Sequence, residues 1–384
     1  MNRTVNTDNT FRSERDRIRE EDFRLRDRSN LFTDRRFSKF GPSTIEIWRE
    51  DGTYINIRES AVPDTLSNRI LSLQADIPPL KTHSEIFGDD ISRIAYRDCP
   101  LDLQEEEPDP NAIISQSARE AIDQLPIIPN IDISHHFVKE TKSSGEIFNL
   151  LKAKGGPHIV ELLGRTEDGK LVFPRHIDFA PTVFSDGSIS DYKRVLLQLA
   201  DAVIFLHSIG IIHRDLAIRN ILATKDRQSI VLCDLESLYG SNACPEICSA
   251  IFRNLPDAER PYSTKSDVFC FGTTIADFIL NNNIRTPWQY HSGGFIPPPP
   301  FRSIVEACIR RDPADRPSML DVKAMLEAIV EPGISSLYRL IGTNSSSDRT
   351  FEHRYLFVLT LSNQNPLRLS SSRNSSSYGF FLGS

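Results

Sequence analysis

Six cysteines are few for a chain of 384 residues, and their scatter excludes a disulfide framework. A reducing, intracellular environment fits them better. Two of them, Cys244 and Cys248, have no second pair at zinc-binding spacing, so a zinc site is not expected. Positive charge is not in excess either, since 45 lysines and arginines stand against 52 aspartates and glutamates. This balance gives no electrostatic reason to expect nucleic acid as a partner.

Long apolar runs are missing as well. The first 30 residues contain no apolar core of the kind that a signal peptide needs. Nowhere does the chain run for about 18 apolar residues, as a membrane span requires. We therefore expect a soluble, intracellular protein, cytoplasmic or nuclear, that has no membrane as its partner.

Large apolar residues are sparse at both ends of the chain. Residues 1–42 are dense in arginine, aspartate and glutamate, and this composition predicts disorder or, at most, a solvated helix. The tail over residues 334–384 is rich in serine and is also predicted to be disordered. Residues 43–130 form an N-terminal extension without an assigned role, in which β-prone residues on both sides of Asp51-Gly52 predict a β-hairpin.

Residues 131–333 have the clearest pattern of secondary structure. Their first part offers three strand candidates, "HHFVKE", "HIVELLG" and "KLVF", and one helix candidate, "GEIFNLLKAKGG". A longer helix follows, because apolar residues recur at Val195, Leu199 and Val203 before a glycine stop at Gly210. The segment "DVFCFGTTIADFIL" is apolar nearly all round, as a buried helix would be. This order predicts an α+β fold with a small β-rich lobe followed by a larger helical lobe.

Four motifs occur in order within this segment. The first, "IIHRDLAIRN", contains Asp215 and Asn220, and the second, "VLCDLE", contains Asp234. The third and fourth are "KSDVFCFG" and "CIRRDPADRP". Together they resemble the eukaryotic protein kinase family, and the resemblance implies the bilobal fold of that family over residues 131–333.

The resemblance also implies an activity and the residues that carry it. A protein kinase transfers the γ-phosphoryl group of ATP to a hydroxyl group of a protein substrate. Asp215 would orient that hydroxyl and accept its proton, and Asn220 and Asp234 would hold Mg²⁺. Lys139 would contact the α- and β-phosphates and pair with Glu146. An isolated Asp215 would be interpreted as a loop carboxylate that caps backbone amides, but the two residues that accompany it favour catalysis.

The same resemblance implies structural roles for three further residues. Glu246 in "ACPE" is predicted to form a buried ion pair with Arg316, although Glu259 is a rival position for this glutamate. Asp267 is predicted to bond the backbone of the catalytic loop.

Since Glu246 follows Asp234 by only 12 residues, the segment between them leaves little room for a phosphorylation switch. Arg214 would then lose its usual partner.

The small lobe departs from the family pattern. The sequence before Lys139, "LPIIPNIDISHH", has no glycine, so the backbone amides that would cover the phosphates are not expected. Only seven residues separate Lys139 from Glu146, which also follows Ser143 by three residues and could belong to a capping box. Lys142 is a second candidate for the phosphate-binding lysine, and a plain surface position is the alternative for either lysine.

The second motif departs as well. Asp234 is followed by Leu235 and Glu236, where the family has phenylalanine and glycine. Leu235 can fill the apolar slot, whereas Glu236 adds a negative charge that would be either an added metal ligand or a hindrance. These departures leave a second hypothesis, a pseudokinase that acts as a nucleotide-binding or scaffold module. A third, a small-molecule phosphotransferase, is disfavoured by "KSDVFCFG" and "DPADRP".

The acceptor hydroxyl stays open between serine or threonine and tyrosine. Ala217 stands where serine/threonine kinases commonly carry a lysine, and Arg219 resembles the tyrosine-kinase form of the loop. The proline-rich "GGFIPPPPF" is interpreted as a loop between helices rather than as a polyproline ligand. Nothing in the sequence sets the oligomeric state.

Overall fold

A β-rich part and a helical part both occur in the computed structural model, which describes residues 2–41, 43–100, 114–141, 143–178, 187–235, 244–281, 288 and 296–331. These residues belong to one unit, Met1–Ser335. The serine-rich tail predicted over 334–384 lies outside the described residues, as do Lys142, Glu236 and Ala243. None of the helices formed by the described ranges is both long enough and apolar enough to cross a membrane.

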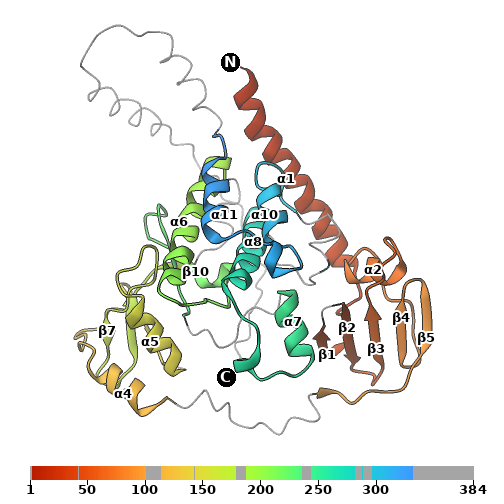
Figure 1. Cartoon of the computed structure of the whole chain (residues 1–384), viewed down its shortest axis with the longest axis horizontal. Coiled ribbons are helices and arrows are strands. Elements are labelled where there is room, and N and C mark those ends of the chain that lie inside the picture. Colours follow the sequence, from red (N-terminus) through yellow and green to blue (C-terminus); the bar gives the residue numbers. More distant parts are fainter. Residues whose placement is uncertain are drawn as a thin grey trace, which may run out of the picture. The chain divides into compact units, whose positions relative to one another are not determined.

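The N-terminal residues form a helix, α1 (Asn2–Arg28), which is the alternative to disorder in the prediction for residues 1–42 (Figure 1). Phe11 on this helix is 2% exposed, and its ring lies 5.9 Å from that of Tyr192, centroid to centroid. The guanidinium of Arg15 is also buried and donates a hydrogen bond to the hydroxyl of the same tyrosine. The predicted disorder is therefore wrong, and the helix is not fully solvated as predicted, because its partners lie far along the chain, where local composition does not reveal them.

The extension predicted over residues 43–130 contains most of a five-stranded sheet (Figure 1). Its elements are β1 (Arg35–Phe40), β2 (Thr44–Arg49), β3 (Tyr54–Arg58), α2 (Leu66–Leu71), β4 (Ser84–Phe87) and β5 (Asp90–Arg93). The strands lie in chain order, and all neighbours are antiparallel except β3 and β4, which are joined through α2. The predicted hairpin is confirmed by the pairing of β2 with β3, and Gly52 in its turn has a positive φ of 82°.

The sheet has a core of its own. Isoleucines alternate along β2 and β3, so that one face of each strand is buried. Trp288, which lies far along the chain, also belongs to this cluster. Lys39 of β1 reaches Asn254, just after helix α7 (Pro245–Phe252), with its Nζ 2.8 Å from Oδ1. The five-stranded sheet therefore contacts the helical part of the chain.

The small lobe begins in the last part of the predicted extension and continues beyond it. Its elements are α4 (Gln116–Asp123), β6 (His136–Lys139), α5 (Ser144–Lys152), β7 (Gly164–Arg165) and β8 (Leu171–Pro174). The strands lie in the order β6-β8-β7, and the strands predicted for "HHFVKE" and "KLVF" and the helix between them are confirmed. The strand predicted for "HIVELLG" is wrong except for its last residue, Gly164. Its apolar residues instead run beside the helical lobe, where Val160 donates its backbone N–H to the carbonyl of Leu232.

The helical lobe completes the described chain. Besides α7 it contains β9 (Ile177–Asp178), α6 (Ile189–Ser208), η3 (Ile218–Asn220), β10 (Ile221–Ala223), β11 (Ile230–Leu232), η4 (Asp257–Glu259), α8 (Thr264–Leu280), α10 (Arg302–Cys308), η5 (Pro313–Asp315) and α11 (Met319–Glu327). A capping box of Ser188 and Asp191 begins α6, and Gly210 follows its end with a φ of 72°. The predicted order of a β-rich lobe and a helical lobe is confirmed.

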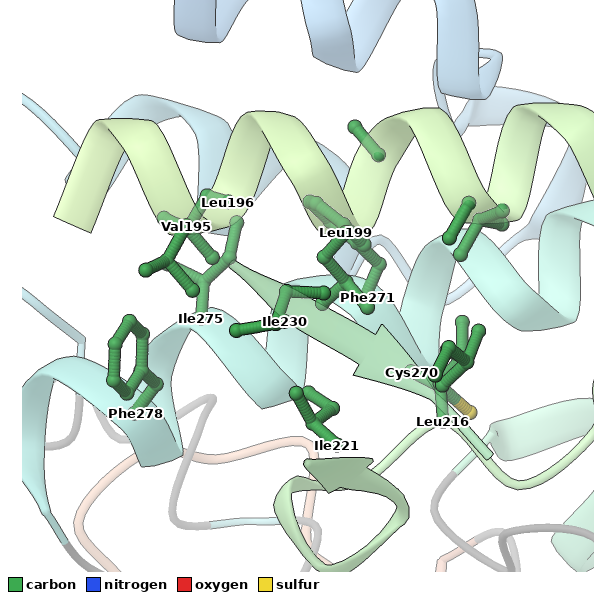
Figure 2. Packing of buried hydrophobic residues seen from close by; sticks show 14 of the residues in the cluster. Val195, Leu196, Leu199, Leu216, Ile221, Ile230, Cys270, Phe271, Ile275 and Phe278 are labelled. Carbon is green, nitrogen blue, oxygen red and sulfur yellow. The ribbon is translucent and has the colours of Figure 1, made fainter. Parts of the chain in front are cut away.

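The core of the helical lobe lies between α6 and α8. Figure 2 shows Val195 and Leu199 of α6 gathered with Phe271 and Ile275 of α8, and with Ile230 of β11. Helix α8 is buried on nearly every side, as predicted from apolar residues nearly all round it. This rigid centre is the support for the loop that precedes η3.

Candidate active site

A cleft of about 490 Å³ lies between the small-lobe sheet and the first strands of the helical lobe. Four of the five predicted site residues line it, namely Lys139, Glu146, Asn220 and Asp234. The remaining lining side chains are mostly apolar or aromatic: Phe137, Leu150, Val160, Phe173, Pro174, Arg175, His176, Leu222 and Cys233. Its volume and its few charged groups are typical of a site for a small molecule or a cofactor.

The loop that carries Asp215 is tied to α8 through Asp267. The fully buried carboxylate of Asp267 accepts hydrogen bonds from the backbone N–H groups of His213 at 2.8 Å and Arg214 at 2.9 Å. His207 of α6 contacts the same carboxylate at 2.8 Å. The structural role predicted for Asp267 is confirmed. Two bonds to consecutive amides also explain how Arg214 is held at a positive φ of 69°.

Asp215, the fifth predicted site residue, is bonded to Asn220. The Nδ2 of Asn220 donates to the backbone carbonyl of Asp215 at 2.7 Å and to its Oδ2 at 2.8 Å. The other carboxylate oxygen of Asp215 is contacted by the guanidinium of Arg219. Since the amide nitrogen of Asn220 faces Asp215, the amide oxygen of Asn220 is the atom that is left for a cation.

Lys139 joins the small lobe to Asp234. Its Nζ donates to Oε1 of Glu146 at 2.8 Å and to Oδ1 of Asp234 at 2.9 Å. The capping alternative is also partly present, because Oγ of Ser143 accepts the backbone N–H of Glu146 at 3.1 Å. The two interpretations are compatible, since the backbone of Glu146 is capped while its side chain pairs with Lys139. Asp234 itself has a positive φ of 63°, which is strained for a residue other than glycine.

The residues that follow the cleft include the predicted structural ion pair. Arg316 donates from two guanidinium nitrogens to the two carboxylate oxygens of Glu246, each at 2.8 Å. The side chain of Arg316 is completely buried, whereas the rival Glu259 is exposed. The choice of Glu246 is confirmed. This bidentate pair anchors the start of α7 to the end of the helical lobe.

Two residues at or next to the cleft were not predicted from the sequence. His176 lines it, and burial lowers the pKa of its imidazole below the ordinary value, so the ring is neutral at pH 7. Asn149 on α5 donates its side-chain N–H to the backbone carbonyl of Leu235 at 2.8 Å. Leu235 is fully buried and fills the predicted apolar slot. The position of Asn149 one helical turn after Glu146 is the signal that could have identified it.

The oxygen donors of the cleft fit a magnesium ion. Within the described ranges, no three histidine, cysteine, aspartate or glutamate side chains gather as a metal cage. Magnesium does not require such a cage, because proteins usually bind it through one or two carboxylates together with substrate phosphates. The partly exposed carboxylate of Asp234 and the amide oxygen of Asn220 form an open pair of this kind.

Comparison with known proteins gives a family match over half of the chain. The model of the protein kinase domain matches residues 135–326, which include all five site residues. The chain is 28% identical over 217 residues to a "Probable serine/threonine-protein kinase" of Dictyostelium discoideum, and 28% over 165 residues to the tyrosine-protein kinase receptor torso of Bombyx mori. It is 25% identical over 162 residues to the serine/threonine/tyrosine-protein kinase HT1 of Arabidopsis thaliana.

These alignments cover only part of this chain and only part of each relative. They cover 47%, 37% and 36% of this chain, and 35%, 20% and 40% of the three relatives in the same order. The matched part corresponds to the small lobe and the helical lobe. The five-stranded sheet and α1 lie before the residues that the family model matches.

Proposed function

The chain belongs to the protein kinase family, and from this premise we propose that it transfers the γ-phosphoryl group of ATP to a hydroxyl group of a protein substrate. One observation carries the proposal: Lys139, Asn220 and Asp234 line a single cleft, and Asp215 is bonded to Asn220 beside it. Phosphoryl transfer needs positioned groups and charge neutralisation more than covalent chemistry, and these side chains supply both.

Asp215 is the proposed base. Its carboxylate is oriented by Asn220 on one oxygen and by Arg219 on the other. In the proposed reaction the hydroxyl oxygen of the substrate attacks the γ-phosphorus, the bond from that phosphorus to the β,γ-bridging oxygen breaks, and Asp215 accepts the hydroxyl proton. The acceptor is a serine, threonine or tyrosine hydroxyl, in keeping with relatives whose names cover all three.

Asn220 and Asp234 are the proposed magnesium ligands. When bound, the ion would neutralise negative charge on the phosphates of ATP. Lys139 is proposed to reach the α- and β-phosphates, because its Nζ already lies between Glu146 and Asp234 at the cleft. Glu146, which is 2% exposed, orients that ammonium group toward the cleft.

A pseudokinase is the second candidate, and the small-lobe sheet favours it. Among the described residues, no strand pairs with the free edge of β6, and Phe137 on that strand is 47% exposed. The sequence before Lys139 also lacks the glycines that would bring backbone amides to the phosphates. A chain built in this way could bind a nucleotide without turning it over.

Two measurements on the purified chain separate these candidates. The first is transfer of labelled phosphate from ATP to a generic protein acceptor, with and without Mg²⁺. The second is the thermal shift produced by ATP with and without Mg²⁺, repeated with Asp234→Ala. Magnesium-dependent transfer supports the kinase. A magnesium-dependent shift that Asp234→Ala abolishes, without any transfer, would support a nucleotide-binding pseudokinase and contradict the kinase.

A further inference from the structure

Arg214, the residue before the proposed base, is held by a carboxylate from another part of the chain. Its guanidinium lies 3.0 Å from Oδ2 of Asp257 in η4. The same guanidinium lies over the ring of Tyr262, 4.5 Å from the ring centroid. Arg260 contacts the other oxygen of Asp257 at 3.2 Å. Asp257 therefore sits between two arginines, and an aromatic face covers the one that belongs to the catalytic loop.

This cluster is more than a contact between two solvated charges. Arg214 and Asp257 are each 27% exposed, so the pair is largely withdrawn from water. An isolated surface ion pair contributes little because its charges are screened and its side chains are ordered at an entropic cost. Here two guanidinium groups share the carboxylate, and the ring restricts the motion of one of them. Both the screening of the charges and the entropic cost of ordering the side chains are therefore smaller.

The backbone of Arg214 transmits this restraint to Asp215. Asp267 holds the backbone N–H of Arg214 from α8, and Asp257 holds its side chain from η4. Both anchors act on a residue with a positive φ of 69°, a conformation that persists only when its surroundings enforce it. The direction in which the next residue, Asp215, presents its carboxylate thus depends on both aspartates.

We propose that Asp257 is a positioning residue, which supplies from the chain itself the negative charge that holds Arg214 and aligns Asp215. This inference rests on the proposed kinase function. In protein kinases a phosphate on the activation segment can provide such an anion for an arginine. Glu246 follows Asp234 by only 12 residues, which leaves little room for a phosphorylation switch between them. Asp257 already forms an ion pair with Arg214. Transfer by this chain is therefore independent of phosphorylation of the chain.

The test uses the full chain and three variants, Asp257→Asn, Asp257→Glu and Glu259→Gln. Asp257→Asn keeps the size of the side chain but removes its charge, and should lower kcat by about 10- to 100-fold, as expected for a misplaced catalytic group. The KM for ATP should not change, because the cleft residues are untouched. Asp257→Glu should restore part of kcat. Glu259→Gln, an exposed neighbour on the same turn, should behave like the unsubstituted chain.

A second arm of the experiment needs no variant. The unsubstituted chain is treated with a phosphatase, mass spectrometry establishes that it carries no phosphate, and its initial rate is compared with that of the untreated chain. Equal rates are expected. A dephosphorylated chain that loses activity would overturn the proposal, and so would an unchanged kcat in Asp257→Asn. This arm keeps the proposal testable even if Asp257→Asn fails to fold.

Failure of the proposed function gives a different result. If the unsubstituted chain transfers no phosphate under any condition, the kinase function fails and so does the positioning role. The ion pair itself is then tested by a double-mutant cycle on thermal unfolding with Arg214→Gln, Asp257→Asn and both together. Additive shifts in Tm would show that Asp257 does not hold Arg214, whereas non-additive shifts would restrict Asp257 to a structural role.

Discussion

Lys139 and Glu146 form an ion pair of 2.8 Å although only seven residues separate them. Strand β6 ends at Lys139 and helix α5 begins at Ser144, so the chain reverses within four residues and sets the first helical turn beside the end of the strand. The side chain of Glu146 is 2% exposed and that of Lys139 is 23% exposed. The two partners are therefore unequal, since only Glu146 has no access to water.

This inequality predicts different costs for the two single substitutions. Lys139→Met should lower the free energy of unfolding by about 3–5 kcal/mol, because it leaves a buried carboxylate without its cation. Glu146→Gln should lower the free energy of unfolding by less, because the ammonium group of Lys139 can still reach water and Asp234. Denaturant unfolding of both variants measures the difference. Equal losses would contradict the unequal burial.

The bidentate pair of Arg316 and Glu246 should be a major contributor to stability. Arg316→Ala should lower the free energy of unfolding by about 3–5 kcal/mol, because Glu246 then loses both of its guanidinium contacts. Arg119→Ala, at an exposed position on α4, is the control and should stay within about 0.5 kcal/mol of the unsubstituted chain. Chemical denaturation compares them, and a loss below 1 kcal/mol for Arg316→Ala would reject the structural role of the pair.

Helix α1 offers a matched test of whether it is an integral part of the fold. Phe11 is 2% exposed whereas Phe23, on the same helix, is 57% exposed. Phe11→Ala should lower stability by about 3–5 kcal/mol, since it empties a site between the rings of Tyr192 and Phe301. Phe23→Ala should have little effect. If the two variants unfold alike, α1 is not packed as described.

His176 predicts a pH dependence of stability. Burial lowers the pKa of His176 in the folded chain below the ordinary value of histidine, about 6.5. Below that pH the unfolded chain binds a proton that the folded chain resists, so stability should be full above pH 6.5 and fall as the pH drops toward the folded pKa. His176→Gln should remove part of this slope in Tm measurements between about pH 7 and 5.

The loop around Asp215 was predictable because its contacts are local or belong to motifs. Asn220 reaches Asp215 across five residues, and Asp267 lies within a motif of its own. The pairing of Lys139 with Glu146 was ambiguous because both the ion pair and the helix cap fit the same spacing, and only the geometry shows that both form.

Long-range contacts set the limit of prediction from sequence. The burial of Arg15 depends on Tyr192, 177 residues away, so the charged composition of α1 pointed to disorder or to a solvated helix. Asp257 lies 43 residues after Arg214, outside every motif, and a lone aspartate carries no signal. In both cases the deciding partner is supplied by the tertiary fold and not by the neighbouring sequence.

Asp215 is the proposed base in phosphoryl transfer, and the kinase function depends on it. The most direct measurement compares the rate of magnesium-dependent transfer from labelled ATP by the full chain with that of Asp215→Asn. Asp215→Asn should lower the rate by about 10²- to 10⁴-fold, the range that general base catalysis supplies, while the thermal shift with ATP is retained. A rate indistinguishable from that of the unsubstituted chain would contradict this role.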